Sequence, residues 1–196
     1  MRVLVIGASG TIGSAVVTAL RAKHEVLEAS RKGPLKIDIT DSKSIQALYR
    51  EVGKVDAVVS CAGGATMKPL QALSDGDFND TLNDKLMGQV NLVRLGLDSD
   101  NLNDNGVFLL TGGIFSHKPM PGASAIAMVN GALESFARGA ALDLPRGIRI
   151  NTVSPPFIEE TAKKMGFPGG LPASENAKAY VKLLEGKETG QVVFPE

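Results

Sequence analysis

The chain has 196 residues, of which 43% are hydrophobic, and it carries 21 basic and 21 acidic side chains. A formal net charge of zero gives no field that would attract nucleic acid or an anionic membrane, so neither is an expected partner. The single cysteine, Cys61, cannot form an internal disulfide, and with two distant histidines it makes no recognisable metal site. We therefore expect one domain spanning 1–196, located in the cytoplasm, with no transmembrane run and no metal.

The first stretch of the chain predicts a strand, a glycine-rich turn and a helix. The apolar run Arg2–Ile6 leads into Gly7-Ala8-Ser9-Gly10-Thr11-Ile12-Gly13, and the amphipathic segment Ser14–Arg21 follows. Glycine permits a tight turn and lets a pyrophosphate approach the backbone, while free N–H groups at a helix start face the anion. The order strand, turn, helix therefore predicts a nucleotide phosphate site at residues 7–13.

The remaining elements alternate along the chain. Further strands are predicted over Glu25–Ala29, Leu35–Ile37, Val55–Val59, Val107–Leu110, Gly147–Val153 and Gly190–Phe194. Further helices are predicted from a cap at Thr40 or Asp41 to Glu51, from Ser74 to Leu97, from Ala123 to Leu142 and from Ala173 to Glu185. Asn103–Gly106 is predicted to be a turn. The alternation predicts an α/β, Rossmann-type fold, with a doubly wound, seven-stranded parallel sheet and helices on both faces.

Two loop regions bear on function. The small residues Ser60–Gly64 follow a strand that is apolar on both faces, at the edge of the sheet where ligands of open α/β folds bind. The Pro- and Gly-rich stretch Ser154–Leu171 is a candidate mobile lid over a substrate, or equally a partner-binding surface.

The end of the second strand indicates which nicotinamide nucleotide is preferred. An NAD-binding fold usually has an acidic residue about twenty residues after the glycine turn, where it binds the ribose 2′-hydroxyl. Here the corresponding residues are Ser30, Arg31 and Lys32. An arginine can pair with a 2′-phosphate in bidentate fashion, so NADP(H) is favoured and NAD(H) is less expected. The alternative is a solvated basic turn.

Taken together, these landmarks resemble the short-chain dehydrogenase/reductase family over almost the whole chain. The turn Gly7-x-x-Gly10-x-x-Gly13 is similar to the family's cofactor turn, although its second glycine lies one residue earlier than in the commonest form. Further similar motifs are Asp38-Ile39, Cys61-Ala62-Gly63, Arg149-Ile150-Asn151-Thr152-Val153-Ser154-Pro155 and Thr189-Gly190-Gln191. Pro156 departs from the family, which usually has glycine there.

The resemblance implies a set of cofactor-binding residues. The acid-plus-aliphatic pair Asp38-Ile39 is what the family uses against adenine, and Ile158 and Thr161 fall near positions that meet the carboxamide. The implied set is Gly7, Ser9, Gly10, Thr11, Ile12, Gly13, Ser30, Arg31, Asp38, Ile39, Cys61, Ala62, Gly63, Pro155, Ile158 and Thr161.

The family's catalytic residues are not retained. Placed by the surrounding motifs, the tyrosine position falls on Ile126 and the lysine position on Asn130. The serine position falls on or next to Gly113, and the asparagine position falls on Lys85. The two tyrosines of the chain, Tyr49 and Tyr180, fall in helices that we expect to be peripheral.

One exchange compensates for these losses. The asparagine position carries Lys85 and the lysine position carries Asn130, which keeps one cation and one amide in the expected pocket. A desolvated lysine has a lowered pKa and transfers protons near neutrality. We therefore predict that Lys85 and Asn130 are catalytic, with Ser124 and Thr111 as the nearest hydroxyls for orienting a carbonyl. The alternatives are an exposed helix lysine and a helix-packing amide.

Two functions remain open at this point. The first is an NADP(H)-dependent oxidoreductase of the short-chain type, with a non-standard site, acting on a small carbonyl or alcohol substrate. The second is a non-catalytic NADP(H)-binding sensor or regulatory protein on the same fold. The resemblance also implies a homodimer or homotetramer formed through the helices around 76–97 and 123–142.

Overall fold

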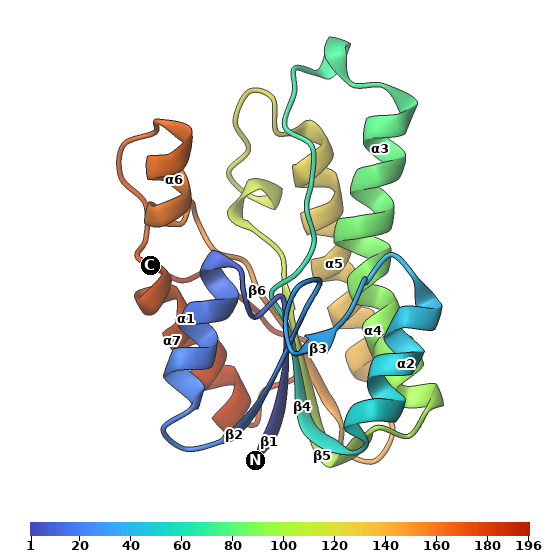
Figure 1. Cartoon of the computed structure of the whole chain (residues 1–196). Helices are drawn as coiled ribbons and strands as arrows, with labels where there is room; N and C mark the ends of the chain where they lie inside the picture. Colours follow the sequence, from blue (N-terminus) through green and yellow to red (C-terminus); the bar gives the residue numbers. More distant parts are fainter.

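The computed structural model describes all residues from 1 to 196 and contains one seven-stranded parallel sheet (Figure 1). The strands are β1 (Arg2–Ile6), β2 (Glu25–Ser30), β3 (Leu35–Lys36), β4 (Val55–Ser60), β5 (Leu102–Thr111), β6 (Arg149–Val153) and β7 (Val192–Val193). They lie in the order β3-β2-β1-β4-β5-β6-β7, and every pairing is parallel. The predicted doubly wound α/β fold is confirmed. No helix of the structure is long and apolar enough to cross a membrane.

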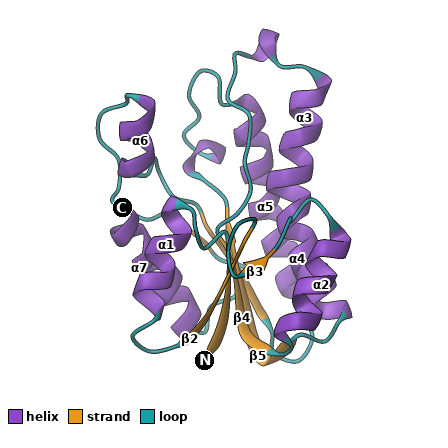
Figure 2. Cartoon of the chain, in the orientation of Figure 1, coloured by secondary structure: helices purple, strands orange, loops and turns teal.

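Helices cover both faces of the sheet, giving three layers (Figure 2). The α-helices are α1 (Thr11–Leu20), α2 (Ser42–Val52), α3 (Asp75–Thr81), α4 (Gly88–Asp98), α5 (Ser124–Asp143), α6 (Glu159–Met165) and α7 (Ala173–Glu185). Helices α1 and α7 pack together on one face, and α2, α4 and α5 lie on the other. The shorter turns are η1 (Leu70–Ala72) and η3 (Ile114–Ser116), whereas η2 (Leu82–Met87) is a π-helical segment joining α3 to α4.

The alternation of side chains along β1 explains the two cores. Leu4 and Ile6 point into the cluster under α2, α4 and α5, whereas Val3 and Val5 point into the cluster under α1 and α7. All four side chains are fully buried, as expected for a central strand of a parallel sheet.

The sequence also sets where the helices start. Asp41 caps α2 by accepting a hydrogen bond from the Lys43 amide at 2.9 Å, so the cap is Asp41 and not Thr40. Ser74 and Asp77 form a reciprocal capping box at the start of α3. Helix α1 starts at Thr11 rather than Ser14, which makes the glycine turn tighter than predicted.

Two further predictions need correction. Strand β5 begins at Leu102, so the turn expected at Asn103–Gly106 lies inside a strand. A bulge accommodates these residues: Val55 of β4 pairs with Leu102, and Ala57, two residues later, pairs with Val107. The stretch expected to be a lid loop, Ser154–Leu171, contains the short helix α6.

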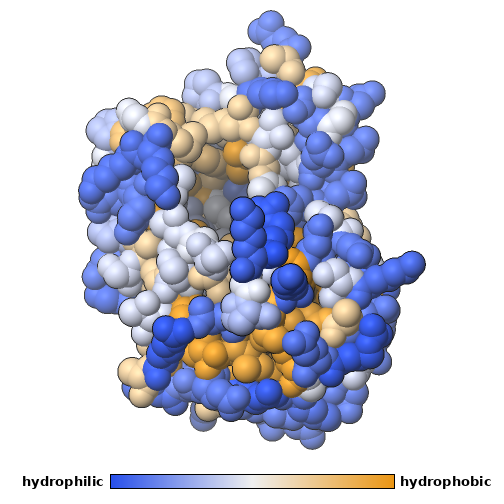
Figure 3. All heavy atoms as spheres, in the orientation of Figure 1, coloured by the Kyte–Doolittle hydropathy of each residue, from blue (hydrophilic) through white to orange (hydrophobic).

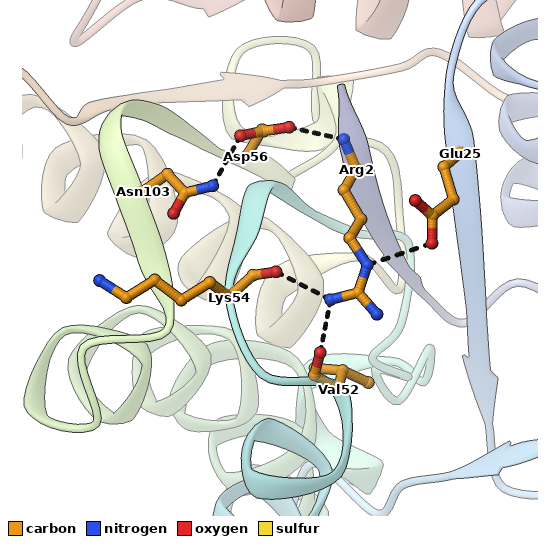
Figure 4. Close-up of polar contacts among 6 residues, drawn as sticks. All are labelled: Arg2, Glu25, Val52, Lys54, Asp56 and Asn103. Atoms are coloured by element: carbon orange, nitrogen blue, oxygen red, sulfur yellow. Dashed lines mark hydrogen bonds and ion pairs between the residues drawn. The ribbon is translucent and has the colours of Figure 1, made fainter.

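The amino edge of the sheet is tied together by Arg2 (Figure 4). Its guanidinium donates to the carbonyl oxygens of Val52 at 2.5 Å and Lys54 at 2.8 Å, and it pairs with Glu25 at 3.1 Å. One side chain therefore joins β1, β2, the end of α2 and the turn before β4.

Asp56 completes this junction. Its carboxylate accepts from the Arg2 amide at 2.6 Å and from the Asn103 side chain at 2.8 Å. The Asn103 bond, the Arg2 amide and the nearby positive charges hold the pKa of Asp56 below its usual value of 3.8. The interaction therefore stabilises the fold at pH values above the usual pKa of 3.8, and this stabilisation is lost as the pH falls through the lowered pKa of the folded state.

We expect Asp56→Asn to lower the free energy of unfolding by about 1 kcal/mol at neutral pH, because the charged acceptor of two hydrogen bonds is lost. The difference should shrink as the pH falls below about 4, where the carboxylate is protonated in the unfolded chain, and should be lost below the lowered pKa of the folded state. Urea unfolding at several pH values measures both effects. The control is Asp100→Asn, which removes the exposed ion pairs with Lys54 and Arg146 and should change stability by less. Equal losses in the two variants would contradict a special role for Asp56.

Candidate functional site

The β1–α1 turn forms a backbone cradle at the carboxyl edge of the sheet. Gly7 has φ +80°, and a Cβ there would lie 2.8 Å from the carbonyl carbon of Cys61. A Cβ on Gly13 would lie 2.1 Å from the Gly7 oxygen, so α1 can approach the turn only with glycine at this position. Gly10 precedes α1 and provides no side-chain cap, which leaves the helix start free to face an anion. The cradle thus fits a phosphate-bearing ligand.

A groove of about 900 Å³ runs from this cradle across the ends of β1, β2 and β4. It brings together most of the predicted cofactor residues: Gly7, Ser9, Gly10, Ser30, Arg31, Asp38, Ile39, Cys61, Ala62 and Gly63. Thr11 and Gly13 do not line the groove. Sequence reasoning did not assign Thr40, Gly64 or Asp84 to it, although all three lie along its wall.

The far end of the groove carries two free cations. Arg31 and Lys32 are exposed, line the groove and form no ion pair. Asp38 belongs to the same lining, and hydrogen bonds from the Thr40 hydroxyl and amide hold its pKa below the usual value. This end can therefore receive a further negative charge at Arg31 and a hydrogen-bond donor at Asp38.

A second cavity, of about 240 Å³, adjoins the groove and shares Gly63 with it. Figure 3 shows the corresponding hollow in this face of the molecule, with apolar residues along its upper rim. The lining comprises Ile12, Gly63, Ala65, Lys85, Gly112, Gly113, Ile114, Phe115, Ile126, Asn130, Pro155, Pro156, Phe157, Ile158 and Thr161. Lys85 is the only charged residue in this set.

Lys85 reaches the cavity from the π-helical segment η2. Its side chain passes over Gly63, where a Cβ would come within 3.2 Å of the lysine Cδ. Burial lowers the pKa of Lys85 to about 8, against the opposing influence of Cys61 and Asp84. No hydrogen bond or ion pair holds the ammonium group. π-Helical segments are frequent at functional sites, and nothing in the sequence signalled this one.

Asn130 lies in the same cavity, on α5. The residue is 1% exposed and its Oδ1 has no hydrogen-bond partner. Its Nδ2 lies 2.7 Å from where a Gly113 Cβ would be, so the loss of a side chain at position 113 makes room for the amide. The structure thus places Lys85, Asn130 and Ile126 in the lining of one cavity, and the catalytic roles of Lys85 and Asn130 stay a prediction.

The structure does not bring the predicted hydroxyls to this cavity. Thr111 is 4% exposed, and its hydroxyl donates to the Ser60 carbonyl and lies 2.7 Å from the Tyr180 hydroxyl. Ser124 is exposed at the start of α5 and is not part of the lining.

We expected both tyrosines to lie in peripheral helices, but the structure buries them. Tyr49 and Tyr180 are 1% and 0% exposed, because their helices turn these side chains into the two cores. The Tyr49 hydroxyl donates to the Leu92 carbonyl at 2.6 Å. Burial raises the pKa of both phenols well above 10, and neither residue lines the cavity. No phenol is therefore available there as a proton donor.

An aromatic wall was missed by the sequence reasoning. Phe115 packs edge-on against Phe157 with ring centroids 5.3 Å apart, and Phe157 lies 5.6 Å from Phe167. These rings come from the loop after β5 and from both sides of α6. Of the three rings, Phe115 and Phe157 line the cavity and make part of its surface apolar.

Comparison with known proteins decides the family. Residues 8–194 match the family described as enoyl-(acyl carrier protein) reductase, which covers nearly the whole chain. The chain belongs to the short-chain dehydrogenase/reductase family of oxidoreductases. Members of this family bind nicotinamide cofactors, which agrees with the cradle and groove.

Individual relatives agree with this assignment. The chain is 30% identical over 149 residues to a hydroxynaphthalene reductase, arp2, of Aspergillus fumigatus, covering 71% of this chain and 54% of that protein. It is 26% identical over 178 residues to the 3-oxoacyl-[acyl-carrier-protein] reductase FabG of Escherichia coli, covering 80% and 72%. The match thus spans only about half the length of the Aspergillus enzyme.

Solved structures show the same architecture. The protein lin1944 of Listeria innocua is 46% identical, with a TM-score of 0.95 over 99% of this chain and 98% of that one. A small-chain dehydrogenase in complex with NADPH is 24% identical, with a TM-score of 0.89 over 100% and 96%, and supports the fold.

We expect Gly7→Ala to weaken binding of a nicotinamide dinucleotide by more than about tenfold, since the added Cβ collides with the Cys61 backbone and displaces the cradle. The control is Gly53→Ala, which has a similar positive φ of +66° but no atom within 4 Å of the added Cβ. Both variants should lose about 1 kcal/mol or more of stability through backbone strain. Titration of cofactor fluorescence with each variant checks the difference, and unaltered affinity in Gly7→Ala would refute the cradle.

Proposed function

We propose that this protein is an NADP(H)-dependent oxidoreductase that acts on a small carbonyl or alcohol substrate, with Lys85 in place of the family's tyrosine. The observation that carries the proposal is the isolation of Lys85. It is the only charged residue of the cavity, it has no partner, and burial lowers its pKa to about 8. An ammonium group with such a pKa can give up and recover a proton near neutral pH.

The groove and cavity divide the cofactor between them. The cradle at Gly7 and Gly10 would hold the phosphates, Asp38 the adenine, and Arg31 a 2′-phosphate. Pro155, Ile158 and Thr161 would line the nicotinamide end. When bound, the cofactor supplies or accepts the hydride.

The residues of the chain supply the remaining chemistry. Lys85 donates a proton to the carbonyl oxygen during reduction and takes it back during oxidation. Asn130, with an unpartnered Oδ1 and a nearby Nδ2, orients the polar end of the substrate or of the lysine. Ile126, Phe115 and Phe157 keep water away from the apolar part of a small substrate.

Because the family's catalytic residues are absent, the second candidate function is a non-catalytic NADP(H)-binding sensor. Binding of NADPH without oxidation across a broad panel of carbonyls would favour it. The chain has no tryptophan, so NADPH emission can be followed with little interference.

Self-association through α4 and α5 is part of the proposal, as a homodimer or homotetramer. Large apolar side chains are exposed on α5 and on the segment before α4: Met87 is 40% exposed, Met128 43% and Leu142 87%.

Arg31→Ala should weaken binding of NADPH by about tenfold while NADH binding changes little, because only NADPH carries the 2′-phosphate that Arg31 would pair with. Fluorescence titrations of both nucleotides measure the ratio. Arg50→Ala removes an exposed cation of α2 outside the groove and should leave both affinities unchanged. If wild-type protein bound NADPH and NADH equally, the role given to Arg31 would fail.

Lys85→Met should lower carbonyl reduction by more than about a hundredfold and leave NADPH affinity nearly intact, because the only proton donor in the cavity is removed. In the wild type, reduction should fall as the pH rises through about 8, since the ammonium is then deprotonated, and alcohol oxidation should rise over the same range. Steady-state rates against pH, with exposed Lys43→Met as the control, test both statements. Undiminished turnover in Lys85→Met would contradict the role of Lys85 as the proton donor.

A further inference from the structure

A buried carboxylate lies just outside the cavity and has no part in the proposed proton transfer. Glu134 is on α5, one helical turn after Asn130, and is only 2% exposed. An ionised carboxylate is costly to bury unless hydrogen bonds replace its hydration. The hydrogen-bond partners of Glu134 therefore indicate what the buried carboxylate does in the structure.

Three side chains from two loops supply these hydrogen bonds. The Ser116 and Ser154 hydroxyls lie 2.6 Å and 2.8 Å from Oε1 of Glu134. Nε2 of His117 lies 2.9 Å from Oε2. Ser116 and His117 belong to the loop after β5, whereas Ser154 follows β6 directly. One carboxylate thus joins the ends of two neighbouring strands.

Both serines also contact the backbone of Gly113, which lines the cavity. The Gly113 amide donates to the Ser154 hydroxyl at 3.3 Å, and the Gly113 carbonyl lies 3.1 Å from the Ser116 hydroxyl. Ser154 is followed by Pro155, whose carbonyl accepts from the Ile114 amide at 2.8 Å, so the two segments lie side by side in the cavity lining. Glu134 therefore braces this joined pair of segments.

The terminal segment is held by the same group. The His117 ring packs edge-on against Phe194, with centroids 4.5 Å apart, while its Nε2 faces the carboxylate. The chain beyond β7 thus covers the loop that contains Gly113.

We propose that Glu134 is a positioning residue that holds the adjoining segments at Gly113 and Pro155 in the position needed for the nicotinamide end of the cofactor. It touches neither cofactor nor substrate and acts through Ser116 and Ser154. The proposal rests on the proposed function for the identity of the ligand, but the link between the two loops follows from the hydrogen bonds alone.

Two measurements on Glu134→Leu test the proposal. The first is hydrogen–deuterium exchange without cofactor, where amides of 113–117 and those of Ser154 and Phe157 should exchange faster while the rest of the sheet stays protected. The second compares NADPH with 2′-phospho-ADP-ribose, which has the same phosphates but no nicotinamide. The variant should lose roughly tenfold in affinity for NADPH and little for the fragment, because only the nicotinamide end meets the displaced segments.

Further variants separate positioning from general destabilisation. Glu134→Gln keeps the shape and one acceptor oxygen and should recover most of the NADPH affinity. The double variant Ser116→Ala/Ser154→Ala should reproduce Glu134→Leu, and it replaces that variant if Glu134→Leu does not fold. Ser135→Ala, an exposed neighbour on α5, is the matched control.

The two proposals fail in different ways. Unchanged exchange of both segments, or equal loss of NADPH and fragment affinity, would overturn the role of Glu134. If the wild type bound neither nucleotide, the proposed function would fail, and the exchange measurement would still decide whether Glu134 joins the loops.

Discussion

The close contact between the ends of β1 and β4 is the constraint on which the site depends. The Cys61 amide donates to the Ile6 carbonyl at 2.8 Å and the Gly7 amide to the Ala29 carbonyl at 2.9 Å, so three strands end at one point. No Cβ fits on Gly7 there, nor on Gly13 against the Gly7 carbonyl. The chain must therefore turn sharply over the sheet edge, which aims the start of α1 at the groove. The connections that follow β1 and β4 run to opposite faces of the sheet. Ligands of open α/β sheets bind at the strand ends where the connections diverge in this way.

Two chemically different spaces meet at this edge. The groove is polar and ends at unpaired cations, which suits a nucleotide, whereas the adjoining cavity is largely apolar around one lysine and one amide. The absence of a side chain at Gly113 and Gly63 is what lets Asn130 and Lys85 occupy that cavity. A larger residue at either glycine would displace the polar side chain beside it.

Much of this could be predicted from the sequence because the signals were local. The alternation of apolar runs and helical segments gave the sheet, and α7 begins and ends at the predicted residues. Spacing from the family motifs placed Lys85 and Asn130 in one cavity. The direction of the Thr111 hydroxyl was not accessible, since a strand pattern that is apolar on both faces does not tell which face a given side chain meets.

Other features depend on contacts between distant segments. Tyr180 is buried because α7 packs on α1, and no pattern within α7 identifies its partner Thr111. The wall formed by Phe115 and Phe157 joins residues from separate loops. The carboxylate of Glu134 gathers donors from two loops, although in the sequence it is one polar residue in a helix of small ones.

The most direct test of the central claim, a nucleotide cradle joined to a cavity whose one cation is Lys85, is a crystal structure of the complex with NADPH. The account predicts the 2′-phosphate beside Arg31 and the nicotinamide inside the cavity, with the Lys85 ammonium within hydrogen-bond reach of the cofactor or of the space above its ring. A nicotinamide lying outside this cavity, or a Lys85 side chain turned away to solvent, would contradict it.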